Sequence, residues 1–275
     1  MPATNPARRP GATSGYVPVN GLDMYYEIHG DGSPLALLHG AMGTIDSCFA
    51  NLLPALAAAR QVIAIELQGH GHTADVDRPL SYRQMADDTA ALLEALGIGT
   101  ADFFGYSLGG AVAVALAMRH PALARRVVFA GGASYRRDGL YPEMLEEPES
   151  AADDLAGSVW HEAYLRVAPD PGRWPDLVAK NFELDRTFAG WPDEDIQALA
   201  APVLLIIGDS DIVRPEHTMQ MFRLLGGGVV GDIAGLPASQ LAVLPGTSHV
   251  GLLDRVDWLQ SMVLEFLGSP EPRPR

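Results

Sequence analysis

The chain contains 275 residues, 48% of them hydrophobic, and it carries a formal net charge of −15 at pH 7. A chain of this size can bury the core of one α/β domain. Its negative charge argues against nucleic acid or an anionic membrane as a partner, because both would repel it. Cys48 is the single cysteine, which excludes a disulfide within the chain.

The two ends of the chain predict disordered segments. Residues 1–15 include the pair Arg8-Arg9, but no apolar stretch follows it as one would in an export signal. Residues 269–275 are also poor in apolar side chains. No apolar run reaches the roughly 18–20 residues that a membrane-spanning helix needs. We therefore expect a cytoplasmic protein whose folded part spans residues 16–268.

The predicted elements begin with two extended runs in residues 16–30, separated by Asn20-Gly21, a pair typical of tight β-hairpins. Six further apolar runs are typical of buried parallel strands. In chain order they are residues 34–40, 61–71, 100–107, 125–132, 202–209 and 240–246. Helix-like stretches separate several of them, and another closes the domain at 252–267. This alternation predicts an α/β fold with a doubly wound, mostly parallel eight-stranded sheet that opens with an antiparallel hairpin.

Residues 134–199 interrupt the alternation of strands and helices. The segment is helix-prone and contains three of the four tryptophans, Trp160, Trp174 and Trp191. A linker would be poor in aromatic residues, so we expect a helical cap insertion whose apolar underside covers the sheet and walls a pocket. The alternative is that these aromatic side chains pack the insertion against itself.

Gly105-Tyr106-Ser107-Leu108-Gly109 fits the pattern G-x-S-x-G at the junction of a predicted strand and a predicted helix. A tight turn there would expose the Ser107 hydroxyl, and glycine is needed where a side chain would collide with the neighbouring backbone. The helix that follows places free N–H groups beside the serine, where negative charge can develop. The motif therefore predicts a nucleophilic serine.

A serine hydroxyl becomes a good nucleophile when a base removes its proton and a carboxylate orients that base. Asp209 and Asp211 are the candidates after the strand at 202–209, and His249 follows the strand at 240–246. Both loops lie at the C-terminal ends of predicted strands, where open α/β sheets place their sites. The chain order of serine, aspartate and histidine is that of α/β-hydrolases.

The chain resembles the α/β-hydrolase superfamily over roughly residues 16–268. The motifs that carry the resemblance occur in the expected order and are "LLHGAMG", "ELQGHGHT", "GYSLGG", "GDSDIVRP" and "GTSHVG". The pattern is most similar to small-substrate esterases and to the cofactor-free haloperoxidase or perhydrolase group. The resemblance implies a catalytic triad of Ser107, Asp211 and His249, and it favours Asp211 over Asp209 as the acid.

The resemblance also implies an oxyanion hole formed by the backbone N–H groups of Ala41 and Leu108. It assigns His39 to the support of its loop rather than to catalysis. We expect the substrate to contact side chains from the loops and from the cap. These side chains are Met42, Tyr106, Trp160, Trp191 and Val250.

Two other patterns suggest sites but lack essential parts. "ELQGHGHT" contains Glu66, His70 and His72, yet no second cluster of histidines or cysteines supplies the remaining zinc ligands. The glycines at 226–228 are not followed by the lysine and serine or threonine of a phosphate-binding loop, and they predict a flexible surface loop. We therefore expect no metal and no cofactor.

The sequence thus predicts a serine carboxylesterase that acts on small-molecule esters with small to medium apolar acyl or aryl groups. Serine at position 107 argues against dehalogenases and epoxide hydrolases, because members of the superfamily with those activities carry aspartate as the nucleophile at this turn. A perhydrolase or cofactor-free haloperoxidase and a C–C bond hydrolase remain alternatives on the same triad. A non-catalytic ligand receptor is the rival from a different functional class.

Overall fold

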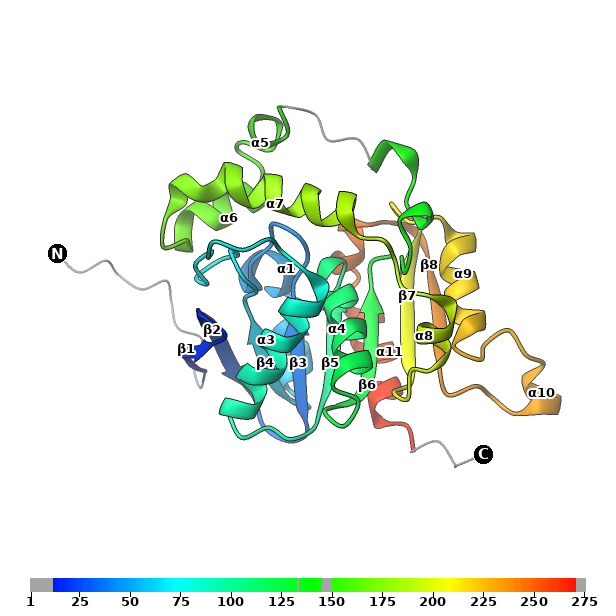
Figure 1. Ribbon diagram of the computed structural model, residues 1–275. Coiled ribbons are helices and arrows are strands. Elements are labelled where there is room, and N and C mark those ends of the chain that lie inside the picture. Colours follow the sequence, from blue (N-terminus) through cyan, green and yellow to red (C-terminus); the bar gives the residue numbers. More distant parts are fainter. Residues whose placement is uncertain (1–11, 133, 145–149, 271–275) are drawn as a thin grey trace.

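One eight-stranded sheet forms the centre of the computed structural model, which describes residues 12–132, 134–144 and 150–270 (Figure 1). The spatial order of the strands is β1-β2-β4-β3-β5-β6-β7-β8. β2 pairs antiparallel with β1 and β4, and all other neighbours pair in parallel. The predicted sheet is therefore confirmed. Its strands are β1 (Thr13–Val19), β2 (Leu22–His29), β3 (Pro34–Leu38), β4 (Gln61–Ile65), β5 (Ala101–Tyr106), β6 (Ala124–Ala130), β7 (Val203–Ser210) and β8 (Gln240–Ser248).

Helices cover both faces of the sheet, so alternate strand residues enter two separate cores. In β3, Ala36 and Leu38 pack on one face, whereas Leu35 and Leu37 pack on the other. The first face is covered by α3 (Tyr82–Ala95), α4 (Leu108–Arg119), α8 (Asp193–Gln197) and α9 (Pro215–Leu224). The second face is covered by α1 (Ile45–Phe49), α2 (Leu52–Ala57) and α11 (Val256–Gly268).

The ordered part of the chain begins earlier than the sequence predicts. Residues 13–15 belong to the expected disordered arm, but they extend β1, and Thr13 lies opposite Ile28 of β2. These residues are ordered because β2 offers backbone hydrogen-bonding groups to them, whatever their side chains. Residues 1–11 of the expected arm lie outside the described residues.

The C-terminal helix ends close to the predicted position. A short 3₁₀ segment, η4 (Val250–Asp254), precedes α11. Ser269 and Pro270, which the sequence assigns to a disordered tail, are held because the Arg126 guanidinium donates hydrogen bonds to both carbonyl oxygens at 3.0 and 2.9 Å. The rest of that expected tail lies outside the described residues.

The segment 134–199 divides between two places. α5 (Ala151–Asp154), α6 (Val159–Val167) and α7 (Trp174–Thr187) lie over the C-terminal ends of the parallel strands, at the top of Figure 1. α8 instead lies beside the sheet near α9, where Ile196 is fully buried in the main core. Short 3₁₀ turns complete the segment, namely η1 (Arg137–Gly139), η2 (Pro142–Met144) and η3 (Pro171–Arg173).

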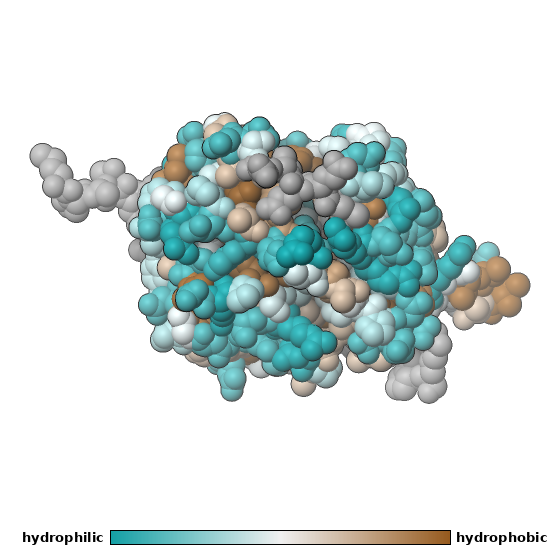
Figure 2. All heavy atoms as spheres, turned by 45° about the horizontal axis from the view of Figure 1, so that its top comes forward, coloured by the Kyte–Doolittle hydropathy of each residue, from teal (hydrophilic) through white to brown (hydrophobic). Residues whose placement is uncertain are grey.

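The glycine-rich stretch before β8 leads into an arm that projects from the body of the protein. The arm contains the short helix α10 (Gly231–Ala234). Val230, Ile233 and Leu236 are exposed on it. The arm forms the apolar lobe at the right edge of Figure 2. Among the helices formed by the described residues, none is both long enough and apolar enough to cross a membrane.

The turn between β5 and α4 brings the helix against the strand backbone. An added Cβ at Gly109 would lie 2.1 Å from the carbonyl oxygen of Leu38, and one at Gly105 would lie 2.2 Å from the carbonyl oxygen of Gly109. Only glycine allows this approach, because the obstructing atoms are backbone atoms and cannot rotate away. The position of α4, and with it the turn at Ser107, depends on these two residues.

Two buried histidines join the loops that follow β3 and β4. His39 bonds through Nδ1–H to the Gly40 carbonyl oxygen at 2.8 Å, and its Nε2 accepts from the Leu67 N–H at 3.1 Å. The ring of His70 packs against that of His39 with centroids 4.9 Å apart. Burial lowers the pKa of His39 to about 3 and that of His70 to about 4, so both rings are neutral at physiological pH.

We expect Gly109→Ala to lower the free energy of unfolding by more than about 2 kcal/mol, because its Cβ would overlap strand backbone. Gly99→Ala is the matched control, since nothing lies within 4 Å of an added Cβ there. Urea denaturation of the two variants measures the difference. Equal stability of both variants would contradict the packing argument.

Because His39 and His70 are buried as neutral rings, we expect the free energy of unfolding to fall at acidic pH. Their pKa values are lower in the folded than in the unfolded chain, so their contribution is complete above the unfolded pKa of about 6.5 and is lost as the pH falls below it. Each should lower the free energy of unfolding by about 2 kcal/mol between about pH 7.5 and about pH 5.

Urea titrations of the wild type and of His70→Gln across this range test the prediction. The variant should have a lower free energy of unfolding than the wild type at neutral pH. On acidification this free energy should fall less steeply in the variant, because its unfolding takes up about one proton fewer. The same pH slope in both proteins would refute the assignment.

Candidate active site

Ser107 occupies the turn between β5 and α4 in a backbone conformation that side chains rarely adopt, with φ at 52° and ψ at −118°. Its backbone N–H donates to the Ala130 carbonyl oxygen at 2.8 Å, and its own carbonyl oxygen accepts from the Gly110 N–H at 2.9 Å. These bonds hold the strained residue in place. The N–H groups of Leu108 and Gly109, the first two of α4, have no carbonyl partner within the helix, so they are available beside the serine.

His249 lies between Ser107 and Asp211. Its Nε2 is 3.0 Å from Ser107 Oγ, and its Nδ1 is 2.8 Å from Asp211 Oδ1. The Asp211 side chain is fully buried, and the Ile212 N–H also donates to Oδ1 at 2.8 Å. The three side chains, of which the first and last are 142 residues apart in the sequence, therefore form one hydrogen-bonded chain.

Asp209, the other acidic candidate in this loop, has different partners. Its carboxylate accepts hydrogen bonds from the backbone N–H groups of Gly246 at 2.9 Å and Thr247 at 3.1 Å. These two donors hold the pKa of Asp209 below its usual value. Asp209 thus fixes the end of β8, from which the chain continues to His249, while Asp211 contacts the imidazole.

Tyr106 holds the backbone of His249 in place. Its hydroxyl donates to the His249 carbonyl oxygen at 3.1 Å, and the two rings lie 5.2 Å apart. A Cβ at Gly131 would come within 2.6 Å of the Tyr106 ring. Tyr106, which the sequence predicts to contact the substrate, is buried, bonds to the histidine backbone and is absent from the described lining of the cavity beside Ser107.

The loop after β3 carries a second strained residue. A turn closed by the bond from the Gly43 N–H to the Gly40 carbonyl oxygen places Met42 at a φ of 58°. This turn sets the orientation of the preceding residue, Ala41. Ala41 and Leu108, the two residues expected to donate to an oxyanion, both line the same cavity as Ser107.

The cavity beside Ser107 has a volume of about 80 Å³. Its wall combines apolar side chains with a polar side contributed by the cap and by the segment after β6. The described residues that line it are Ala41, Tyr82, Ser107, Leu108, Ala111, Phe129, Gly131, Gly132, Ser134, Arg136, Arg137, Leu140, Asn181, Asp185, Phe188, Ile212, Val213 and His249.

Asn181 and Asp185 of this wall are missing from the residues that the sequence proposes. They lie one turn apart on α7, so they share a helix face. One signal could have revealed Asn181: it interrupts the apolar stripe formed by Leu177, Val178 and Leu184, all of which are buried. An amide within a buried stripe needs partners and points to a specific role.

The five side chains expected to contact substrate lie elsewhere among the described residues. Trp160 packs into the core of the cap around Tyr164 and Trp174, and Met42, from the loop after β3, packs against the same cluster. Val250 is half exposed. With Tyr106 and Trp191, these residues are absent from the described lining of the cavity beside Ser107.

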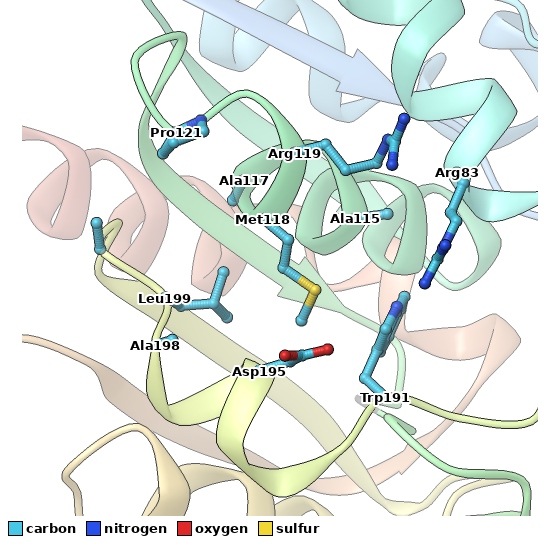
Figure 3. A pocket seen from close by; sticks show the side chains of 11 residues that line it. Arg83, Ala115, Ala117, Met118, Arg119, Pro121, Trp191, Asp195, Ala198 and Leu199 are labelled. Carbon is cyan, nitrogen blue, oxygen red and sulfur yellow. The ribbon is translucent and has the colours of Figure 1, made fainter.

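Trp191 borders a different cavity, of about 330 Å³, between α4 and α8 (Figure 3). Arg83, Met118 and Asp195 surround it there. Arg119 also borders this cavity, but its guanidinium is bound to Asp87 by two hydrogen bonds of 2.8 and 2.7 Å. The described lining contains neither serine nor histidine, so it offers no nucleophile with a base.

Glu66 and His72 bond to each other in the loop after β4. The Glu66 carboxylate accepts from the backbone N–H of Ile45 at 3.1 Å and that of His72 at 2.6 Å, and it lies 2.8 Å from His72 Nδ1. Its oxygens thus join α1 to this loop. Within residues 12–270 as described, no group of three or more histidines, cysteines or carboxylates is arranged to hold a metal.

Comparisons with known proteins agree with this architecture. The family described as alpha/beta hydrolase fold matches residues 33–158. A 2-hydroxymuconate semialdehyde hydrolase from Pseudomonas sp. (strain CF600) is 39% identical over 221 residues, which cover 69% of this chain and 74% of that protein. A pimeloyl-acyl-carrier-protein methyl ester esterase from Neisseria meningitidis serogroup B is 29% identical over 252 residues, with coverages of 84% and 91%.

Among solved structures, a meta-cleavage product hydrolase from Pseudomonas fluorescens IP01 superposes with a TM-score of 0.72 at 24% identity. The superposition covers 93% of this chain and 97% of that chain. At 24% identity, this structural similarity is evidence for a shared fold alone. Together with the sequence relatives, it shows that the chain belongs to the alpha/beta hydrolase family.

Proposed function

We propose that the protein is a serine hydrolase that cleaves carboxylic esters with small acyl groups, using Ser107, His249 and Asp211. The observation that carries the proposal is the hydrogen-bonded chain of these three side chains beside a cavity. Imidazole bonded on one side to a hydroxyl and on the other to a buried carboxylate is the arrangement that activates serine for acyl transfer.

In the proposed reaction, Ser107 Oγ attacks the ester carbonyl carbon while its proton passes to His249 Nε2. Asp211 accepts the Nδ1–H bond, which keeps the imidazole in the required tautomer and stabilises the imidazolium. The backbone N–H groups of Ala41 and Leu108 stabilise the tetrahedral oxyanion. Collapse breaks the ester bond, and the leaving alcohol takes the proton from His249.

The second half of the reaction regenerates the enzyme. Water gives a proton to His249 Nε2 as it attacks the acyl-enzyme, and collapse of the new tetrahedral intermediate returns that proton to Ser107 Oγ. The carboxylic acid then leaves. Protein groups and water supply every proton and electron pair in this cycle.

The cavity favours small acyl groups over the medium-sized ones that the sequence suggests. Its volume of about 80 Å³ is well below the few hundred Å³ of a typical pocket for a drug-sized ligand. Phe129, Leu140 and Val213 supply apolar surface for a short chain. Trp160, Tyr164 and Trp174 of the cap core are absent from the described wall, to which the insertion contributes the aromatic side chain of Phe188.

A C–C bond hydrolase is the second candidate, favoured by the 39% identity to a 2-hydroxymuconate semialdehyde hydrolase. The same nucleophile and base would serve in either reaction. A kcat/KM for 2-hydroxymuconate semialdehyde above that for p-nitrophenyl butyrate would assign the C–C activity instead. The reverse order supports the esterase.

Ser107→Ala should reduce hydrolysis of p-nitrophenyl acetate and butyrate by at least about a thousandfold, because the nucleophile is removed while the cavity remains. A fluorophosphonate should label the wild type stoichiometrically and leave the variant unlabelled. Full esterase activity in the variant would refute the assignment of Ser107. A wild type that resists labelling would favour a non-catalytic receptor.

The division of roles between the two aspartates gives a separate prediction. Asp211→Asn should lower kcat by about 10³–10⁴-fold, because an amide favours the wrong imidazole tautomer. Asp209→Asn should lose far less activity, since the amide oxygen can still accept from the Gly246 and Thr247 N–H groups. Steady-state kinetics of the two variants compare them directly. A larger loss in Asp209→Asn would reverse the assignment.

A further inference from the structure

Asn181 places a primary amide inside the apolar face of α7. The residue is 4% exposed and lines the cavity beside Ser107. The neighbouring positions on this face, Leu177 and Leu184, are apolar and buried. Burying an amide is unfavourable unless its donors and its acceptor find partners. Its hydrogen bonds therefore indicate what the side chain is for.

The nitrogen of the amide is identified by its two acceptors. Nδ2 donates to the Leu177 carbonyl oxygen at 2.8 Å and lies 3.4 Å from His70 Nε2. His70 Nδ1–H donates to the Gln68 carbonyl oxygen at 2.9 Å, so Nε2 is an acceptor in the neutral ring. Burial lowers the pKa of His70, so the ring stays neutral, and the Nδ1–H bond to Gln68 leaves Nε2 without a proton. The assignment of nitrogen and oxygen in the amide follows from this network.

The oxygen of the amide has no such partner. Within the described part of the chain, no hydrogen-bond donor reaches the buried Oδ1 atom of Asn181. His70 and Leu177, which hold the nitrogen, are outside the described lining of the cavity, whereas Asn181 belongs to it. Tyr82 and Asp185 of the same wall bond to each other at 3.1 Å, so they do not supply the missing donor.

Lys180, the residue before Asn181, attaches α7 to the loop after β4. Lys180 Nζ donates to Asp75 Oδ2 at 2.6 Å and to the carbonyl oxygens of Val76 and Arg78 at 3.0 and 2.9 Å. These bonds join α7 to the loop after β4. An acceptor held by such an anchored helix has a fixed position relative to Ser107, as a residue that orients a ligand requires.

We infer that Asn181 binds the substrate, with Oδ1 accepting a hydrogen bond from a hydroxyl or N–H group that the substrate carries. The inference rests on the proposed ester hydrolysis at Ser107 and narrows its substrate class. A substrate without a donor leaves the buried acceptor unpaired, and a site of this kind discriminates against it. The preferred substrate is thus a short ester that bears a hydroxyl or N–H, rather than a wholly apolar ester.

Matched ester pairs, in which a terminal hydroxyl replaces a terminal methyl, test the inference. Methyl 3-hydroxypropionate against methyl butyrate places the donor on the acyl side. 2-Hydroxyethyl butyrate against propyl butyrate places it on the alcohol side. For at least one pair, the wild type should show a kcat/KM on the order of tenfold higher for the hydroxyl ester. This wild-type comparison does not depend on the folding of any variant.

Asn181→Leu removes the acceptor and keeps a side chain of similar size. In the favoured pair, the ratio of the two kcat/KM values should fall by on the order of tenfold in this variant. Glu183→Gln is the matched control, because Glu183 lies on the same helix, pairs with Arg186 and is absent from the described cavity wall. It should keep the wild-type ratio. Fluorophosphonate labelling of Asn181→Leu verifies that its site is assembled.

The outcomes separate the inference from the proposed function. A wild type that hydrolyses none of the four esters overturns the proposed function and the inference with it. If all four esters are hydrolysed and the ratio of kcat/KM values within each pair is near one, the proposed esterase activity is supported and the role of Asn181 is overturned. That second result is also expected if a water molecule is bound permanently at Oδ1. A hydroxyl preference that persists in Asn181→Leu likewise overturns the inference.

Discussion

The contact between α4 and the backbone of β3 and β5 determines the geometry of the whole site. At Gly109 and Gly105 the helix and strands approach so closely that a single methyl group would overlap backbone atoms. This contact forces the intervening chain through a tight turn and places Ser107 at a positive φ. The serine therefore lies over the strand ends, at the start of a helix whose first N–H groups are free to face an anion.

Rigid hydrogen bonds then bring two distant loops to that serine. Asp209 and Asp211 have separate roles, since the first fixes the end of β8 and the second contacts the imidazole. Tyr106, the neighbour of Ser107 in sequence, donates a hydrogen bond to the backbone carbonyl oxygen of His249. Each of these contacts crosses from one strand end to another, so the arrangement depends on the parallel order of β5, β7 and β8.

The cap serves two purposes with different residues. Trp160, Tyr164, Trp174 and Phe182 pack together and hold the cap helices to one another, while Lys180 attaches α7 to the core. Two polar residues of α7, Asn181 and Asp185, line the cavity beside Ser107 instead. This division explains why a stretch rich in tryptophan yields a cavity whose cap side includes an amide and a carboxylate. Stability of the cap needs apolar burial, whereas orientation of a ligand needs directional hydrogen bonds.

The sequence by itself determined the sheet, the opening hairpin and the candidates Ser107, Asp211 and His249. These features follow from local patterns: buried strands are continuous apolar runs, and tight turns require particular residues. Tertiary structure alone decided that residues 13–15 extend β1, that α8 joins the main core, and that Asn181 rather than Trp160 or Trp191 borders the cavity. Those outcomes depend on which surfaces meet after folding, and contacts between residues far apart in the chain leave no periodic trace in it.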